Sequence, residues 1–295
     1  MSVHDRSIRA PDGGTLVVTE GGARTGPLVF ALHGTPMSGQ LYAPHAEDAR
    51  RRGIRLVSYD RPGYGGSTAR PGRSIASAAS DVAAIADELG VERFGVWGIS
   101  GGGPHALACG ALLPKRTVAV VALASPAPYP AEGLDWLKGQ GESNVAEFHA
   151  SMKGGDALEQ FLRPAREAYF SSDPDAVLRE METLLSPVDR AVFTGELRAH
   201  LSESARRGLR PGVAGWRDDD LAFVRPWGFD VKEVHVPVTL WQGKEDLFVP
   251  YAQGRWLGDR IEHAVKNLTD EDGHLTLYQH RIPSVHSWLM SYLRR

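Results

Sequence analysis

The chain has few of the features that would assign it to a special class of protein. A single cysteine among 295 residues excludes an intrachain disulfide and fits a reducing compartment. The 33 basic and 36 acidic residues give a net charge of -3, with no excess that would attract nucleic acid or an anionic membrane. No run of about 18 apolar residues occurs, and residues 1–6 carry charges where a signal peptide needs an apolar stretch. We therefore expect a soluble, cytoplasmic protein with no membrane span and no nucleic-acid partner.

Loops that bind phosphate groups are also missing from the chain. There is no Gly-x-x-x-x-Gly-Lys-[Ser/Thr] stretch, and residues 63–66 lack the glycine spacing of a dinucleotide-binding fingerprint. We find no internal repeat and no low-complexity tract. A length of 295 residues is sufficient for one large domain or two smaller ones with a real core. These absences argue against a nucleotide-binding protein, but they do not argue against an enzyme.

The most informative stretch that is present is the pentapeptide 98–102, Gly-Ile-Ser-Gly-Gly. The apolar run 93–97 before it predicts a buried strand, and the small residues 103–109 after it predict a helix. Glycine is needed two residues before and two residues after the serine, because a Cβ at either place would collide with the neighbouring strand or helix. The pattern therefore predicts a sharp turn that presents Ser100 toward solvent. The alternative is a glycine-rich turn without a chemical role.

The rest of the chain alternates short apolar strands with helical patterns, as expected of a mostly parallel sheet with helices on both faces. Residues 75–89 repeat apolar side chains at helical spacing, and Gly90 ends that helix. Further helices are expected at 251–262 and from about Pro283 onward. Strands are expected at 15–18, 28–32, 54–58, 93–97, 118–124, 236–241 and 264–268.

The alternation stops between residues 126 and 235. This segment contains charged, helix-forming stretches broken by glycine and proline, and it has no apolar run that resembles a strand. We therefore expect an α/β core made of residues 1–125 and 236–295, with an inserted α-helical cap at 126–235.

A serine nucleophile needs a base within hydrogen-bond reach and a third group that orients the base. Asp246 follows the strand expected at 236–241, so it should lie at the carboxyl edge of the sheet, where Ser100 also lies. His274 follows the last short strand, on a loop that Gly273 makes flexible. The order serine, acid, histidine is the one expected of this turn. Glu245 is the nearest alternative to Asp246, and residues 270–272 are interpreted as a solvated acidic loop.

Two backbone amides are candidates for an oxyanion hole. The amide of Gly101 starts the helix after the serine and feels the positive end of the helix dipole. The second donor is expected just after the strand 28–32, in the stretch His-Gly-Thr-Pro at 33–36. Pro36 has no N–H group, whereas the amide of Thr35 can point into the cleft. A plain proline-containing turn is the alternative for this stretch.

These elements together resemble the α/β-hydrolase superfamily over nearly the whole chain. The resemblance is carried by five stretches, at 33–36, 59–67, 98–102, 243–246 and 273–274. It implies an eight-stranded, mostly parallel sheet, a cap after the sixth strand, and a Ser-His-Asp site without a cofactor or metal. Relatives that open epoxides or remove halides have aspartate at the elbow, so Ser100 excludes that alkylation chemistry. Residues 60–67 are interpreted as a structural turn after the fourth strand.

We therefore expect a serine hydrolase that cleaves an ester, or a thioester or lactone, of a small and largely apolar acyl compound. Ser100, His274 and Asp246 would form the triad, and Gly101 and Thr35 would bind the oxyanion. The alternatives are a serine aminopeptidase or amidase, a carbon-carbon bond hydrolase, a lyase or cofactor-free oxygenase, and a binding protein with a vestigial triad. The sequence leaves open whether the chain forms a homodimer. An apolar substrate pocket is expected from Met37, Ile99, Trp136, Phe248 and Leu275.

Overall fold

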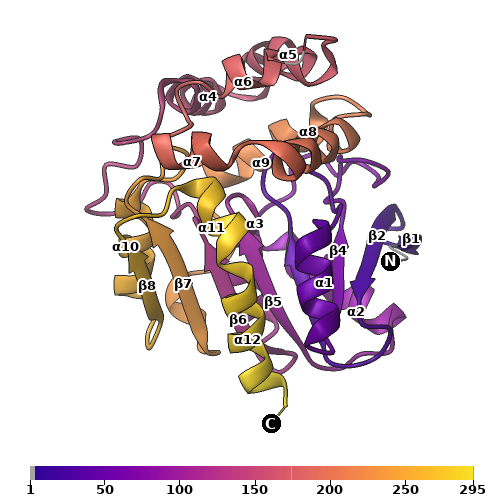
Figure 1. The fold of residues 1–295 in the computed structure, drawn as a ribbon. Coiled ribbons are helices and arrows are strands. Elements are labelled where there is room, and N and C mark those ends of the chain that lie inside the picture. Colours follow the sequence, from indigo (N-terminus) through magenta and orange to yellow (C-terminus); the bar gives the residue numbers. More distant parts are fainter. Residues whose placement is uncertain (1–3, 174, 295) are drawn as a thin grey trace.

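The computed structural model describes residues 4–173 and 175–294, and it is built around one eight-stranded sheet (Figure 1). The first three residues of the charged stretch 1–6 lie outside the described residues. The strand order is β1-β2-β4-β3-β5-β6-β7-β8. The two pairings of β2, with β1 and with β4, are antiparallel, and the other five pairings are parallel. This confirms the prediction of a mostly parallel sheet. The strands are β1 (His4–Arg9), β2 (Thr15–Gly22), β3 (Leu28–Leu32), β4 (Arg55–Tyr59), β5 (Phe94–Ile99), β6 (Thr117–Leu123), β7 (Val238–Gly243) and β8 (Val265–Thr269).

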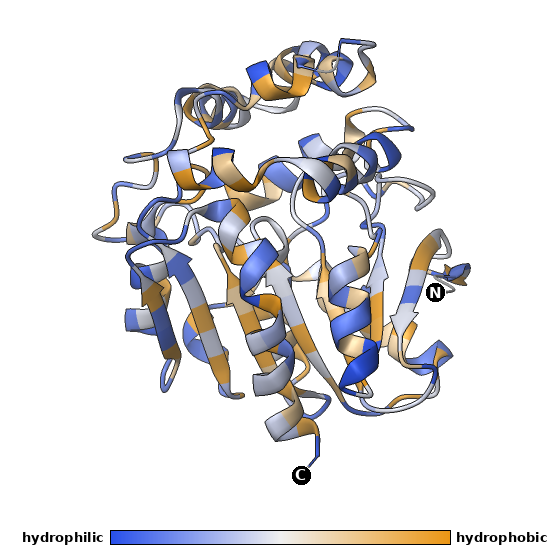
Figure 2. Ribbon diagram, viewed as in Figure 1, coloured by the Kyte–Doolittle hydropathy of each residue, from blue (hydrophilic) through white to orange (hydrophobic). Residues whose placement is uncertain are grey.

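Helices cover both faces of the sheet, so its central strands are buried on both sides. In β3, Leu28, Phe30 and Leu32 pack into the core beneath one set of helices, whereas Val29 and Ala31 pack into the core beneath the other. Figure 2 shows hydrophobic residues, in orange, along several strands of the sheet. Helices α2 (Ser77–Glu88), α3 (Gly102–Leu112) and α10 (Tyr251–Arg260) contribute to the first core, and α1 (Ala43–Arg51) and α12 (Ile282–Leu293) contribute to the second.

Among the described residues, six α-helices come between β6 and β7 in the chain and lie over the carboxyl ends of the central strands (Figure 1). We call α4 to α9 the inserted helices. Within the described part of segment 126–235 no strand occurs, and a separate apolar cluster packs among these helices. None of the described helices has the length and apolar character needed to cross a membrane. The inserted helices are α4 (Glu142–Lys153), α5 (Gly155–Phe170), α6 (Ala176–Glu180), α7 (Pro187–Val192), α8 (Gly195–Gly208) and α9 (Ala214–Phe223).

Three local features differ from the sequence-based expectations. The edge strand β1 was missed because Ile8 is its only fully buried residue, so its pattern has little apolar signal. His274 does not lie on a flexible loop but is the first residue of helix α11 (His274–His280). Asp272 is not solvated either, because it is 3% exposed and accepts a hydrogen bond of 2.9 Å from Arg281. In the last case the partner that orders the segment, Arg281, lies in the helical segment that follows it.

Candidate active site

Ser100 lies in the tight turn between β5 and α3. Its φ angle is +53°, in the left-handed region that non-glycine residues rarely adopt. A Cβ on Gly98 would collide with the carbonyl oxygen of Gly102, and a Cβ on Gly102 would collide with that of Leu32 in β3. Only glycine fits at both positions, as the sequence pattern predicted. The turn therefore holds the Ser100 side chain at the carboxyl edge of the sheet.

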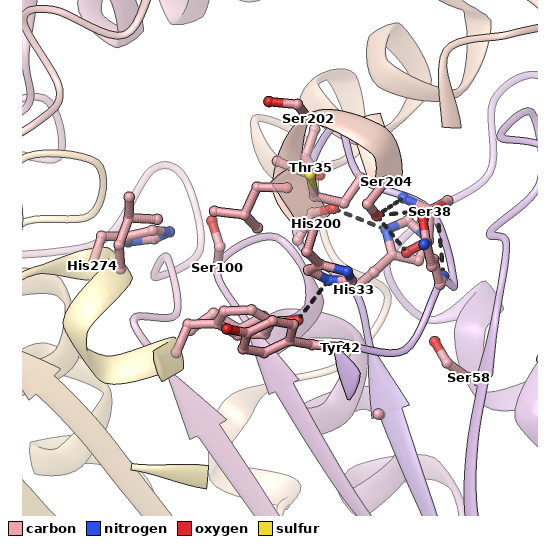
Figure 3. A pocket seen from close by; sticks show the side chains of 18 of the residues that line it. His33, Thr35, Ser38, Tyr42, Ser58, Ser100, His200, Ser202, Ser204 and His274 are labelled. Atoms are coloured by element: carbon pink, nitrogen blue, oxygen red, sulfur yellow. Dashed lines mark hydrogen bonds between the residues drawn. The ribbon is translucent and has the colours of Figure 1, made fainter. Parts of the chain in front are cut away.

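His274 and Asp246 form a buried hydrogen-bonded pair at the same edge. The Nδ1 atom of His274 lies 2.9 Å from Oδ2 and 3.2 Å from Oδ1 of Asp246. The two residues are 5% and 2% exposed. Ser100 and His274 line one cavity, and Figure 3 shows His274 on one side of Ser100, with Tyr42 and His200 on the other. The structure thus brings together the three residues that the sequence selected.

The Asp246 carboxylate is fixed by three further donors. Its Oδ1 accepts hydrogen bonds from the amides of Phe248 and Val249, at 2.9 and 2.8 Å. Its Oδ2 accepts one of 3.1 Å from the side-chain amide of Gln242, at the end of β7. Donors on both oxygens leave little freedom of rotation, so the carboxylate faces the imidazole in a defined orientation.

Asp189 of α7 fixes the position of His274 from the other side. Its carboxylate accepts hydrogen bonds from the amides of His274, Leu275 and Thr276, at 2.8, 2.7 and 3.1 Å. These are the first amides of α11, which would otherwise lack partners. Asp189 is 0% exposed, and a Cβ on Gly273 would lie 2.5 Å from its carboxyl carbon. Asp189, a residue of the inserted helices, therefore caps the start of α11, the helix that carries His274.

The environment of His274 favours its protonated form. Burial lowers the pKa of His274, but the charge of Asp246 and the hydrogen bond to it outweigh burial, so the pKa lies above its usual value. The ring of Phe248 stacks on the imidazole, with centroids 4.4 Å apart and an interplanar angle of 22°. The pair can therefore stabilise an imidazolium, which is what a base needs after it has taken a proton.

Two backbone amides near Ser100 are free to bind a ligand. Within the described residues, neither the Thr35 amide nor the Gly101 amide donates a hydrogen bond to another protein group. The amide of Met37 is already used, since it donates to the carbonyl of Gly34 at 2.9 Å. The Cβ that Gly101 lacks would collide with the Thr35 side chain, so the two residues are close together. They can act as a pair of donors.

A buried ion pair holds the Thr35 loop in place. Arg61 and Asp219 are 1% and 0% exposed, with their charged atoms 2.6 Å apart. Asp219 also accepts hydrogen bonds from the hydroxyls of Thr35 and Tyr64, at 2.7 and 2.8 Å, and Arg61 donates to the carbonyl of His33. Burial opposes the charge of Asp219, but the nearby arginines hold the pKa of its carboxyl well below the usual range. The interpretation of residues 60–67 as a plain turn missed this link to helix α9.

Two cavities meet at Ser100, and their linings differ. The first, which we call the aromatic cavity, has a volume of about 100 Å³. Four of the five predicted pocket residues line it, namely Met37, Ile99, Phe248 and Leu275. Its rings include those of Tyr42, His45, Trp97, His200 and Tyr278, and its hydroxyl groups include those of Ser38, Ser58, Ser202 and Ser204.

The second cavity, which we call the acidic cavity, lies beneath the inserted helices and has a volume of about 140 Å³. It contains Trp136, so the fifth predicted pocket residue is separated from the other four. Thr35, Met37, Ser100 and Phe248 line both cavities, which therefore join at the nucleophile candidate. The acidic residues of the second cavity are Glu147, Glu180 and Asp220, and its larger rings are Trp136, Phe148, Phe161, Trp216 and Phe223.

Burial has a large effect on two of these acids. It raises the pKa of Asp220 well above the usual value, and the neighbouring charge of Glu147 raises it further. Burial also raises the pKa of Glu147, although a hydrogen bond with Asp220 opposes this rise. Trp216 donates a hydrogen bond of 2.7 Å to Glu147. Among residues 4–173 and 175–294, no group of three or more histidines, cysteines and acids is arranged to hold a metal ion.

Comparison with known proteins shows the family of this chain. A family model described as the alpha/beta hydrolase fold matches residues 27–281. The bifunctional esterase/perhydrolase DCH of Acinetobacter calcoaceticus is 26% identical over 274 residues, which are 88% of this chain and 88% of that protein. Epoxide hydrolase B of Mycobacterium tuberculosis is 31% identical over 134 residues, which are 44% of this chain and 37% of that protein.

Similar folds occur among solved structures. The esterase EaEST from Exiguobacterium antarcticum superimposes with a TM-score of 0.68 at 19% sequence identity. The superposition covers 99% of this chain and 100% of that one. At this identity the likeness concerns the fold alone.

Proposed function

Because the chain belongs to the α/β-hydrolase family, we propose that it is a serine hydrolase that cleaves an ester, thioester or lactone of a small, largely apolar acyl compound. The hydroxyl of Ser100 attacks the substrate carbonyl while Nε2 of His274 takes its proton. Asp246 holds the imidazole in the tautomer with the proton on Nδ1 and stabilises the imidazolium. The amides of Thr35 and Gly101 bind the negative oxygen that forms.

The second half of the reaction uses the same groups. The tetrahedral intermediate collapses, the bond to the leaving alcohol or thiol breaks, and His274 gives that group its proton. This leaves the acyl group on Ser100. Water then loses a proton to His274 and attacks the acyl carbonyl, and the acid and free Ser100 are released. No oxidant, reductant or second substrate besides water is required.

The observation that carries this proposal is the convergence of independent elements on one point. Ser100 comes from the turn after β5, Asp246 from the turn after β7, and His274 from the start of α11. The His274–Asp246 pair is buried and doubly hydrogen-bonded, and the amides of Thr35 and Gly101 have no competing partner among the described residues. A glycine-rich turn without a chemical role would not require any of these features.

The cavities support the substrate class. Their volumes, about 100 and 140 Å³, suit a small molecule, and their walls at Ser100 are largely apolar. We propose that segment 126–235 acts as a cap, because α4, α5 and α9 provide walls of the acidic cavity. The esterase named among the relatives agrees with ester cleavage. Ser100 at the elbow argues against the alkylation chemistry that opens an epoxide.

Replacement of the nucleophile tests the proposal. The Ser100→Ala variant should lose about a millionfold in kcat on activated esters, because residues of such a unit contribute together. Turnover of nitrophenyl esters by both proteins, at equal folded concentration, measures this. A variant that keeps most of its activity would show that Ser100 is not the nucleophile. Turnover of an epoxide without turnover of any ester would show that ester cleavage is not the reaction of this protein.

A further inference from the structure

Five of the ring side chains that line the aromatic cavity come from four elements. Tyr42 and His45 come from the start of α1, Trp97 from β5, His200 from α8 and Tyr278 from α11. The first three are 5%, 3% and 4% exposed. Side chains packed this closely have few alternative rotamers, so this wall of the cavity has a defined shape.

The rings contact one another as aromatic pairs do in protein interiors. His45 meets Tyr278 edge to face, with centroids 4.5 Å apart, and Tyr42 stacks on Tyr278 at 5.8 Å. Tyr42 also lies 4.8 Å from His200, whose Nε2 is 3.2 Å from the hydroxyl of Tyr278. The wall thus presents ring faces and edges in a fixed arrangement. A planar aromatic ring is complementary to such a wall.

Apart from His274 beside Ser100, the described lining of the aromatic cavity holds no side chain that could pair with a charged ligand. Among the described residues that line it, none is aspartate, glutamate, lysine or arginine. Burial lowers the pKa of His45 to about 3 and that of His200 to about 4, so both rings are neutral at neutral pH. A charged ligand group would lose its hydration here without a counter-charge. The cavity therefore suits an uncharged ligand.

Two ring nitrogens of the wall, Nε2 of His45 and Nε1 of Trp97, lack a partner among the described residues. Nε2 of His45 is buried and makes no hydrogen bond to the described residues. In contrast, the hydroxyls of Ser38 and Ser204 lie 3.0 Å apart and satisfy each other. Buried polar atoms are nearly always hydrogen-bonded, so a ligand group or a water belongs at this nitrogen. A hydroxyl can both donate and accept, and it therefore suits either tautomer of a neutral imidazole.

We propose that the aromatic cavity binds an uncharged aromatic ring of the substrate and that a hydroxyl on this ring pairs with Nε2 of His45. The inference rests on the proposed function, because Ser100 and His274 line the same cavity and would cleave the bond beside the ring. It narrows the substrate to an ester, thioester or lactone of a hydroxylated aromatic compound.

Ligand binding without turnover tests this assignment. The probes are phenol, toluene and cyclohexanol, titrated into Ser100→Ala by calorimetry. Phenol should bind about two- to tenfold more tightly than cyclohexanol, because only phenol has an aromatic ring. It should also bind about two- to tenfold more tightly than toluene, because only phenol has the hydroxyl. A crystal soaked with phenol should show the ring against Tyr42 and Tyr278, with its oxygen at His45.

Two histidine replacements sharpen the test. His45→Phe keeps a ring but removes the nitrogen, so it should abolish the preference for phenol over toluene while toluene still binds. His280→Phe is the matched control, because His280 is an exposed residue near the end of α11 and does not line either cavity. It should leave both affinities unchanged. If His45→Phe does not fold, the soaked Ser100→Ala crystal still decides the question.

Each part of the proposal would be contradicted by a different result. Equal affinity for phenol and cyclohexanol would overturn the ring site. Equal affinity for phenol and toluene, or a crystal with water on His45 and phenol elsewhere, would overturn the hydroxyl contact. Retained ester turnover in Ser100→Ala would overturn the proposed function, yet it would leave the phenol affinities as measured. Failure of the inference and failure of the proposed function are therefore distinguishable.

Discussion

The two cavities that meet at Ser100 differ in charge. The described lining of the aromatic cavity has no aspartate, glutamate, lysine or arginine, whereas the acidic cavity contains Glu147, Glu180 and Asp220 and no lysine or arginine among its described residues. The first is lined by residues of the sheet, α1, α8 and α11, and the second lies beneath α4, α5 and α9. Since both share Ser100, the two halves of one substrate would meet different environments.

This difference suggests a division of roles within the fold: one set of residues would cleave the bond, and another would determine which substrates bind. The elbow and Asp246 depend on the core strands and the turns after them, and His274 depends also on Asp189 of α7. These three residues would act on any bound ester. The charge around each half of the substrate depends mainly on other elements. Glu147 and Asp220 belong to the inserted helices, and the ring wall combines α1, α8 and α11. We therefore expect some replacements to affect all substrates alike and others to affect only the choice between substrates.

The largest effect after loss of Ser100 is expected for Asp246→Asn, and it should be equal for every substrate. Replacement of the orienting acid costs about 10⁴ in kcat in comparable triads, because the imidazole is held in the wrong tautomer. Activity requires neutral His274, so kcat/KM should rise with pH as His274 loses its proton. Asp246 raises the pKa of His274. In the variant, the rise of kcat/KM with pH should therefore occur at lower pH. A pH profile of kcat/KM checks both points, and an unmoved profile would show that His274 is not the base.

A smaller effect is expected for Asp219→Asn, which weakens the anchor of the Thr35 loop. We expect kcat to fall about 10- to 100-fold for all substrates, less than the 10²- to 10³-fold caused by loss of an oxyanion donor. Asp220→Asn is the matched control, since the adjacent residue lines the acidic cavity instead. Steady-state kinetics, with thermal unfolding to confirm that both variants are folded, measure this. If both variants change the substrate preference to a similar extent, Asp219 does not act on all substrates alike, and this part of the account is wrong.

The acidic cavity itself is tested by Glu147→Gln. An ester with a free carboxylate should be a poor substrate of the wild type, because like charges repel at short range in a buried site. The variant should raise kcat/KM for this ester relative to its neutral methyl ester, by about tenfold for a change of about 1.4 kcal/mol. Glu203→Gln, an exposed position on α8, is the control. If the ratio of kcat/KM for the two esters is unchanged in Glu147→Gln, the charge of the acidic cavity does not affect the choice of substrate.

The smallest effect is expected for Tyr278→Leu, which removes one ring from the aromatic cavity. The preference for a phenyl ester over the matching cyclohexyl ester should fall about two- to tenfold, since an aromatic pair contributes about 0.5–1.5 kcal/mol. The ratio is compared with that of the wild type, so the intrinsic reactivity of the esters cancels. Equal losses for both esters would mean that Tyr278 only fills space.

The placement of the site could be predicted from the sequence where local rules apply. The turn at Ser100 needs glycine at 98 and 102 for steric reasons that involve its immediate neighbours, and these residues stand in the sequence. Asp246 and His274 follow strands that the apolar pattern reveals, so their position at one sheet edge follows from topology. The fold class could be predicted for the same reason. The division into core and cap stays a prediction.

The supporting residues could not be found in this way, because their contacts are distant in sequence. Asp189 lies 85 residues before the His274 amide that it binds, and Asp219 lies 184 residues after Thr35. Both are acids in polar, helix-forming segments, where an acid usually faces water. The division of the predicted pocket into two cavities was also hidden, because Trp136 comes from the segment after β6.

The most direct test of the central claim is to trap the covalent intermediate. The wild type is mixed with a slowly hydrolysed nitrophenyl ester, quenched in acid, digested and examined by mass spectrometry. We predict one acyl group, located on Ser100 and absent from Ser100→Ala. Rapid turnover with no acylated peptide, or an acyl group on another residue, would contradict the account.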